Sequence, residues 1–291
     1  MGPDNTTGRY RLQERLAPEG STWVAEDLED PSQRVVLKFL PESADAIAAR
    51  HVVDNLAKLA SSGLAVPIDE GETPEGRPYL VYRWAEGITL RELMNESGTP
   101  GFARSGRILR QIGSALAALH ARGIVHGAVT PEHIVIRHSH GKDFVTVLHA
   151  GAFRVARETS ASPAYLAPEQ LRGEAIGASD VFSVAAVAAE MLTGRRVFRY
   201  GSLDELDHLH KRGIQRGAFR KLKPKLPLRV EDELRRSLSW DPGQRPADVQ
   251  ILTSRLAESL GGTGTLSKRH LFLLMLLAVA ATVLFWRRFR R

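Results

Sequence analysis

The segment Gly123–His138, GIVHGAVTPEHIVIRH, contains residue types that could do chemistry, in the order expected of a catalytic loop. A histidine is followed by Thr-Pro-Glu and then by a β-branched run typical of a strand. Ala128, which lies between them, can neither accept a proton nor orient a nucleophile. The chain has no cysteine, which excludes disulfides, thiolate metal sites and a cysteine nucleophile. Whether this segment is a working site therefore depends on the residues that other elements bring to it.

The basic charge of the chain is concentrated in one segment. The composition, 43% hydrophobic and 25% charged, is typical of a globular protein. The net charge is +7, but residues 268–291 contain six Lys or Arg and no acid, which leaves 34 cations and 33 acids in residues 1–267. Because this larger part is nearly neutral, no nucleic-acid partner is expected.

The spacing of apolar residues predicts a sheet-rich part followed by a helical part, an α+β fold. Period-two alternation predicts strands over 9–17, 21–29, 34–40 and 77–84, with one helix over 44–60. Helical spacing follows over 103–123, 179–194 and 230–240, around a strand hairpin at 132–149. The expected organisation is a tail (1–9), a domain (10–260) made of a small lobe (10–84) and a helical lobe (88–260), a linker (261–270) and a hydrophobic helix.

That helix is the segment Leu271–Trp286, LFLLMLLAVAATVLFW, which has no charge in 16 residues and is flanked by cations. The pattern predicts a single C-terminal transmembrane helix followed by a basic tail, 287–291, with the lipid bilayer as its partner. Because no apolar leader is visible in the first residues, the folded domain is expected on the cytoplasmic side. At ~1.5 Å per residue the helix reaches about 24 Å, so a re-entrant or surface-lying helix stays open as the alternative.

Seven motifs resemble those of the bacterial type of Ser/Thr protein kinase domain, from about Tyr10 to Leu260. In chain order they are VVLKFL, LVYRWAEGITLREL, LAALHARGIVHGAVTPEHIVI, LHAGAF, YLAPEQLRG, SDVFSVAAVAAEMLTG and DPGQRPADV. The resemblance implies a bilobal protein-kinase-like fold, with nucleotide and metal sites between the lobes.

Four positions that carry the chemistry of this family have other residue types here. The resemblance places Ala128 at the aspartate that accepts the hydroxyl proton, and Thr130 at a lysine. His133 replaces the asparagine that binds the second metal, and His149 replaces the metal-binding aspartate. Since histidine is a poor ligand for magnesium, no catalytic residue and no metal site are expected.

The phosphate-covering loop is altered as well. Ala17, Glu19 and Thr22 lie where the family has glycines that let backbone amides approach the phosphates. Lys38 matches the lysine that contacts the α- and β-phosphates, but Val52 lies where the resemblance implies its glutamate partner.

Residual nucleotide binding stays open. Val24, Val36 and Val135 match the apolar residues on either side of an adenine ring, and Lys38 is the candidate phosphate contact. No cofactor is expected to be required, and ATP bound without a metal is the alternative.

Residues with architectural roles are retained. By resemblance, His126 is a packing residue, Glu169 and Arg245 form a buried ion pair, and Asp180 accepts hydrogen bonds from the catalytic-loop backbone. The sequence thus retains the scaffold and lacks the chemical groups.

We therefore expect a membrane-anchored pseudokinase that serves as a scaffold or allosteric regulator in signalling, with an unidentified protein partner for which a kinase is one candidate. An atypical active Ser/Thr protein kinase is the alternative, and it would need Glu132 or Asp143 as a substitute carboxylate. Of these, Glu132 is expected to point away from the cleft. A zinc or copper ion between His133 and His149 is a further alternative.

Overall fold

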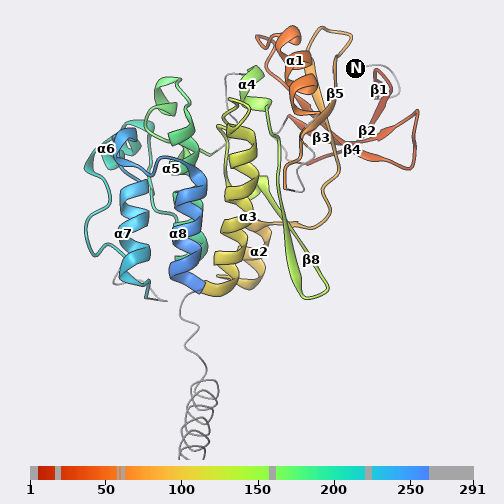
Figure 1. Cartoon of the computed structure of the whole chain (residues 1–291). Coiled ribbons are helices and arrows are strands. Elements are labelled where there is room, and N and C mark those ends of the chain that lie inside the picture. Colours follow the sequence, from red (N-terminus) through yellow and green to blue (C-terminus); the bar gives the residue numbers. More distant parts are fainter. Residues whose placement is uncertain are drawn as a thin grey trace, which may run out of the picture.

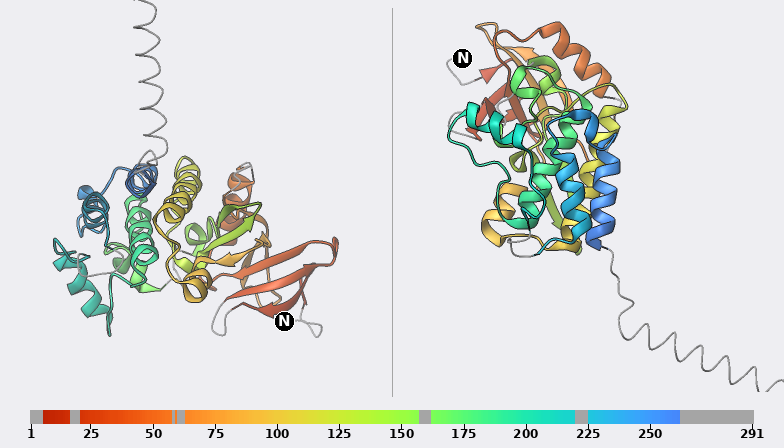
Figure 2. Two further views of the ribbon diagram at one scale, coloured as in Figure 1. Left: turned by 90° about the horizontal axis from the view of Figure 1, so that it is seen from below. Right: turned by 90° about the vertical axis from the view of Figure 1, so that its left-hand side faces the viewer.

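The computed structural model of the chain describes residues 6–16, 21–57, 59, 63–156, 162–219 and 225–261. These residues form two lobes: a β-sheet with one helix, and a larger helical body (Figure 1). The bilobal α+β fold expected from the sequence is confirmed. Figure 2 shows the sheet projecting from one side of the helical body.

The small lobe contains a six-stranded antiparallel sheet with the strand order β1-β2-β3-β4-β6-β5. Its strands are β1 (Thr6–Thr7), β2 (Tyr10–Arg15), β3 (Thr22–Asp27), β4 (Arg34–Phe39), β5 (Pro67–Glu72) and β6 (Pro78–Arg83). Four of them match the predicted strands. The sequence expectation omitted β1, which has two residues, and β5, PIDEGE, which lacks apolar alternation and is defined by its pairing with β6.

Helix α1 (Ala46–Leu56) packs against the sheet and turns one apolar face inward. Asp45 begins the helix, since its side chain accepts a hydrogen bond from the backbone N–H of Ile47 at 2.8 Å. Ala49, Val52 and Leu56 are buried at helical spacing. This face joins a hydrophobic core that continues into the helical lobe, so the two lobes share buried apolar side chains.

The helical lobe is built around α3 (Phe102–His120), α5 (Gly177–Thr193) and α8 (Val249–Gly261), which lie side by side (Figure 1). Helix α5 is buried along almost its whole length, which explains why its sequence is apolar on every face. The remaining helices are α2 (Leu90–Ser97), α4 (Ala152–Ala156), α6 (Leu203–Arg212) and α7 (Leu228–Ser237). The sequence expectation omitted α2, α4, α6 and α8.

A second, three-stranded sheet packs against α3 of the helical lobe (Figure 1) and consists of β7 (Ile88–Thr89), β8 (Ile134–Ser139) and β9 (Lys142–Val147). Strands β8 and β9 form the predicted hairpin. Gln111 of α3 supports it, because its amide donates to the carbonyl of Asp143 at 3.0 Å and accepts from the N–H of Val145 at 3.1 Å. The hairpin thereby fixes the residues at its two ends, His133 and Leu148.

The predicted hydrophobic helix 271–286 and the basic tail 287–291 lie outside the described residues, as does the predicted linker 261–270 except for Gly261, which is the last residue of α8. Among the helices that the structure describes, none combines the length and apolar character needed to span a bilayer.

Candidate functional site: two cavities between the lobes

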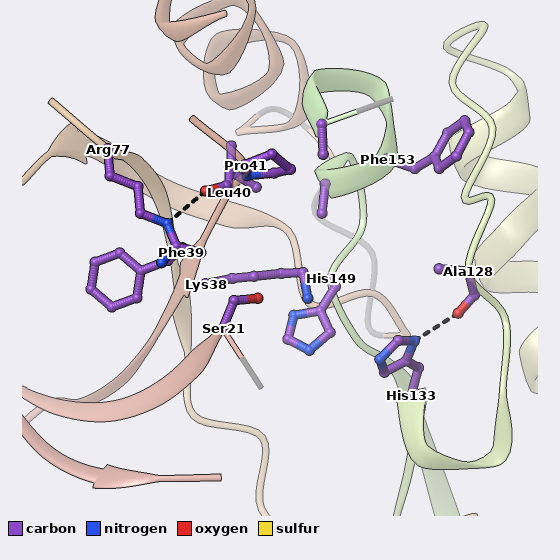
Figure 3. Close-up of a pocket in the computed structure, with 12 residues that line it drawn as sticks. Ser21, Lys38, Phe39, Leu40, Pro41, Arg77, Ala128, His133, His149 and Phe153 are labelled. Carbon is purple, nitrogen blue, oxygen red and sulfur yellow. Dashed lines mark hydrogen bonds between the residues drawn. The ribbon is translucent and has the colours of Figure 1, made fainter. Parts of the chain in front are cut away.

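Two neighbouring cavities lie where the lobes meet, and they share the imidazoles of His133 and His149 as part of their walls. The inner cavity has a volume of about 210 Å³ and the outer cavity about 570 Å³. Strand β4, the segment before β8 and helix α4 line the inner cavity (Figure 3), and the segment from β6 to α2 lines the outer one. Together they occupy the region between the lobes where the sequence resemblance implies a nucleotide site.

The segment that precedes β8 is fixed by one buried carboxylate, Asp180 of α5. It accepts hydrogen bonds from the backbone N–H of His126 at 2.8 Å and of Gly127 at 2.9 Å, and it lies 2.7 Å from Nε2 of His120. His126 is itself buried, with its Nε2 2.8 Å from the carbonyl of Leu148. Burial lowers the pKa of His126, which favours the neutral ring. These contacts give the loop its shape.

Gly127 is required at its position for two reasons. Its φ is +70°, a region that side-chain-bearing residues rarely adopt, and a Cβ atom there would lie 2.5 Å from Cγ of Phe153. The ring of Phe153, from α4, therefore covers the backbone of Gly127. The sequence expectation did not include Phe153 in the site.

His133 and His149 lie face to edge, with ring centroids 5.0 Å apart and an interplanar angle of 89°. Nδ1 of His133 donates to the carbonyl of Ala128 at 2.7 Å. Burial, followed by the charge of Lys38, lowers the pKa of His133 to about 4. The same two causes lower the pKa of His149 well below its usual value. At neutral pH both rings are therefore uncharged.

The conformation of His149 is unusual, because its φ of +61° lies in the left-handed region. Several contacts fix this turn. Its carbonyl accepts from the N–H of Ala152 at 3.1 Å, and the hydroxyl of Tyr82 donates to the carbonyl of Ala150 at 3.3 Å. Tyr82 also contacts the His149 ring, with centroids 5.4 Å apart. Tyr82 is a wall residue that the sequence expectation missed.

Lys38 reaches the inner cavity from β4 (Figure 3) and has no carboxylate partner among the described residues. Burial lowers its pKa to about 8, so the amine is mostly charged at neutral pH. Val52, at the position implied for a glutamate partner, is buried in the core, and the neighbouring Asp54 is exposed.

The structure brings only some of the predicted nucleotide-binding residues together. Val36 and Val135 line the outer cavity, whereas Val24 is buried in β3 opposite Val36. Thr130 is buried, and its carbonyl accepts from the N–H of His133 at 3.0 Å. Thr22 lines the outer cavity, while the calls on Ala17 and Glu19 lie outside the described residues.

The expected orientation of Glu132 was wrong, because this residue lines the outer cavity. Its carboxylate accepts from Nε of Arg91 at 2.8 Å, and Arg91 also donates to Glu190 of α5 at 2.8 Å. Although burial would raise the pKa of Glu132, the hydrogen bond from Arg91 lowers it below its usual value. Glu132 is thus an ionised partner of an arginine and is poorly suited to accept a proton.

Asp143, the other substitute carboxylate considered, does not line either cavity. Its side chain is 3% exposed and accepts two hydrogen bonds from Arg104 of α3, both at 2.9 Å. Nδ1 of His138 lies 2.9 Å from the same carboxylate. The structure therefore assigns Asp143 to the attachment of the β8–β9 hairpin.

Glu169 and Arg245 form the buried ion pair expected from the sequence. Nη1 and Nη2 of Arg245 donate to the two carboxylate oxygens of Glu169 at 2.6 and 2.9 Å. The hydroxyl of Ser179 donates to Glu169 as well, at 2.6 Å. This pair fastens the segment after Tyr165 to the loop that precedes α8.

The donor set of the inner cavity does not fit magnesium, the metal that the fold family implies. Magnesium prefers carboxylate and other oxygen ligands in octahedral geometry, and no carboxylate among the described residues lines this cavity. Across the described part of the chain, no three His, Cys, Asp or Glu side chains cluster as a metal site would require. The polar side chains among its described lining residues are instead those of Ser21, Lys38, Arg77, His133 and His149.

The chain is similar to known kinases along most of its length. The protein kinase domain family matches residues 45–256, from the residue before α1 to within α8. Serine/threonine-protein kinase PknD of Mycobacterium tuberculosis is 29% identical over 280 residues, which cover 90% of this chain and 41% of that protein. PknB of Mycolicibacterium smegmatis is 32% identical over 216 residues, covering 67% of this chain and 34% of that protein. The chain thus spans less than half the length of these two relatives.

Among solved structures, the crystal structure of Rad53 1-466 in complex with AMP-PNP superposes with a TM-score of 0.70. Its sequence is 21% identical, and the match covers 87% of this chain and 67% of that one. This likeness supports the fold alone. The chain therefore belongs to the protein kinase domain family, and its similar curated relatives include bacterial Ser/Thr kinases.

Proposed function

We propose that this protein is a catalytically impaired member of the protein kinase family, a pseudokinase. The observation that carries the proposal is the composition of the inner cavity, where Ala128, His133 and His149 lie in place of the base and both metal ligands. Phosphoryl transfer depends on positioned metal ions that neutralise the phosphates and on a residue that positions the hydroxyl. The described residues of this cavity offer neither.

The retained contacts support a role as a scaffold or allosteric regulator. Asp180 supports the loop before β8, and the Glu169–Arg245 pair supports the large lobe, although the chemistry that these contacts serve in the family is absent. A folded large lobe can still present a surface to a protein partner, for which a kinase is the first candidate.

We further propose that the hydrophobic segment 271–286 anchors the protein to a membrane, with the kinase-like domain on the cytoplasmic side. Its uncharged run of 16 residues, between Lys268–Arg269 and Arg287–Arg288, supports this part of the proposal. Deletion of 271–286 should release the protein from the membrane fraction, and retention of the deleted chain there would contradict the anchor.

The test of catalysis is a phosphate-transfer assay on the full chain with ATP and either magnesium or manganese. We expect no autophosphorylation and no transfer to a generic protein substrate above the level of a Lys38→Ala variant. A rate that clearly exceeds that of Lys38→Ala would overturn the pseudokinase proposal, because Lys38 is the residue that the family uses on the phosphates.

An atypical active Ser/Thr kinase is the second candidate, and the similar proteins PknD and PknB, which are named serine/threonine-protein kinases, favour it. Such an enzyme would need a substitute carboxylate. Glu132 is paired with Arg91, and Asp143 is buried against Arg104, so neither is free to serve. The assay above, with a Glu132→Gln variant added, decides between the two candidates.

A further inference from the structure

One end of the large lobe contains the last residue of α8, Gly261, after which the sequence continues toward the hydrophobic segment. Figure 1 shows the start of α3, the β8–β9 turn and the start of α7 at this same, lower end. Helices α3 and α8 run antiparallel, because a Cβ atom on Gly106 would lie 3.5 Å from Cβ of Leu260 and one on Gly113 would meet Thr253. The chain therefore leaves the folded lobe beside the first turns of α3.

Helix α3 exposes two arginines between its contacts with α8 and its contacts with the β8–β9 hairpin. Gly106 faces α8, and on the other side Arg104 donates two hydrogen bonds of 2.9 Å to Asp143. At ~3.6 residues per turn, Arg107 and Arg110 project between these two contact faces, and both are exposed. They form a basic strip beside the end of α8.

The β8–β9 hairpin adds two exposed cations and an exposed aromatic ring. Arg137 and Lys142 lie on either side of the turn. The guanidinium carbon of Arg137 lies 4.9 Å from the ring centroid of Phe144, which is 45% exposed. An aromatic ring beside a long cationic side chain is favoured where a bilayer meets water.

The start of α7 repeats this combination of charge and apolar surface. Lys225 and Arg229 are exposed, and Leu228 between them is 64% exposed. These apolar side chains among the cations favour a lipid surface as the partner, because a bilayer offers an apolar layer beneath its charged headgroups.

Cations exceed acids over this surface, which we call the basic end and define as residues 94–110, 137–143, 225–229 and 256–261. These ranges contain seven Lys or Arg and three Asp or Glu. The side chain of Asp143 is 3% exposed and pairs with one of the arginines. The exposed charges that remain are six cations against Glu96 and Glu258, so the basic end attracts an anionic surface. The cations are Arg107, Arg110, Arg137, Lys142, Lys225 and Arg229.

The sequence keeps this end close to a bilayer whenever 271–286 is inserted. Nine residues, 262–270, separate α8 from the hydrophobic segment. Even fully extended, a chain of this length spans at most ~32 Å, which is close to the length of the 19-residue helix α3, ~28 Å. Because such a tether makes docking an intramolecular step, a weak electrostatic attraction is enough to populate the docked state.

We propose that the basic end docks on the anionic lipid headgroups of the membrane into which 271–286 inserts. This inference rests on the proposed membrane anchor. Docking holds the large lobe in one orientation, with the small lobe farthest from the bilayer (Figure 1). Each cation next to an anionic membrane contributes about fivefold to the ratio of docked to undocked protein, so several cations together make the docked state dominant.

The experiment uses one introduced thiol, because the chain has no cysteine of its own. Ala103→Cys carries a fluorophore on the exposed side of α3 at the basic end, and Ala57→Cys carries the same fluorophore at the end of α1 as the matched reporter. The full chain is reconstituted in phosphatidylcholine nanodiscs, with or without phosphatidylglycerol, that contain a lipid with a nitroxide quencher on its headgroup. We expect quenching of the Ala103→Cys reporter in discs with phosphatidylglycerol, and no quenching of the Ala57→Cys reporter. At about 1 M salt the Debye length falls to about 3 Å, so the quenching should disappear.

Arg107→Gln combined with Arg110→Gln should lower the ratio of docked to undocked protein about 25-fold, at about fivefold for each cation. The matched control is Arg50→Gln combined with Arg154→Gln. It removes the same charge from exposed positions on α1 and α4, which lie at the opposite end of the molecule (Figure 1), and should leave the quenching unchanged.

Co-elution of the full chain with phosphatidylcholine discs at high salt measures the anchor alone. Co-elution without quenching of the Ala103→Cys reporter refutes the docking surface and leaves the anchor intact, whereas failure to co-elute refutes the anchor and the docking surface that rests on it. Equal quenching with and without phosphatidylglycerol, equal quenching of the two reporters, or an equal effect of the two arginine pairs would also overturn the proposal.

Discussion

Replacement of Glu169 by glutamine should destabilise the protein strongly, although the side chain keeps its shape. The guanidinium of Arg245 is fully buried and donates two of its hydrogen bonds to Glu169. Its other partners are the carbonyls of Ala178, Ser239 and Trp240, none of which carries a charge. Glu169→Gln therefore leaves a buried cation uncompensated, which costs about 3–5 kcal/mol. At about 2–4 °C per kcal/mol for a domain of this size, the melting temperature should fall by roughly 10 °C.

Urea unfolding followed by circular dichroism measures this loss, with Asp207→Asn as the matched control. Asp207 pairs with Lys211 at 2.7 Å on the exposed surface, where water screens the pair, so its loss should change stability little. A double variant, Glu169→Leu with Arg245→Met, should be more stable than either single variant, because no charge is left unpaired. If Glu169→Gln differs from Asp207→Asn by less than about 1 kcal/mol, the reasoning about buried charge is refuted.

The pH dependence of the same variant gives an independent check. Burial acts to raise the pKa of Glu169, but the hydrogen bonds from Arg245 and Ser179 outweigh it and lower the pKa below its usual value of 4.5. A carboxylate with a lowered pKa stabilises the fold at neutral pH, and this contribution is lost as the pH falls below 4.5. The wild type should therefore lose more stability than Glu169→Gln over this range.

Three further predictions concern single residues. Asp180→Asn should lower the free energy of unfolding by about 1.5–3 kcal/mol and speed hydrogen exchange at the Gly127 amide; unchanged exchange would contradict the role assigned to Asp180. Gly127→Ala should lower the free energy of unfolding by about 1–3 kcal/mol, and adding Phe153→Ala should restore part of this loss, because it removes the clash with the new Cβ atom. If urea unfolding shows no recovery in the double variant, the loss comes from the backbone conformation alone. His210 is fully buried with both ring nitrogens lacking a partner among the described residues, so His210→Phe should be at least as stable as the wild type at neutral pH. Burial lowers the pKa of His210 from 6.5 to about 4, so the wild type should lose stability as the pH falls through this range and the variant should lose less; parallel pH profiles would contradict this.

Much of the candidate site could be predicted from the sequence, because motif spacing indicates which residues replace the family's chemical groups. Ala128, His133 and His149 do line the inner cavity, and Lys38 extends into it. The orientation of Glu132 was predicted wrongly, since strand alternation does not apply to the short 3-10 turn, Pro131–His133, on which it lies. The role of Phe153 could not be predicted from the sequence, because it results from the close approach of its ring to Gly127 and not from any motif.

The sequence by itself determined the α+β class, the order of the lobes and the absence of a base at Ala128. These are consequences of local periodicity and of residue type, which need no knowledge of distant contacts. Only the tertiary structure decided that Asp143 is bound to Arg104, that Glu132 is bound to Arg91, and that His149 has a buried nitrogen without a partner in the described residues. Such facts depend on side chains that are far apart in the chain and meet only in the folded core, where the loss of water makes each unpaired charge or nitrogen costly.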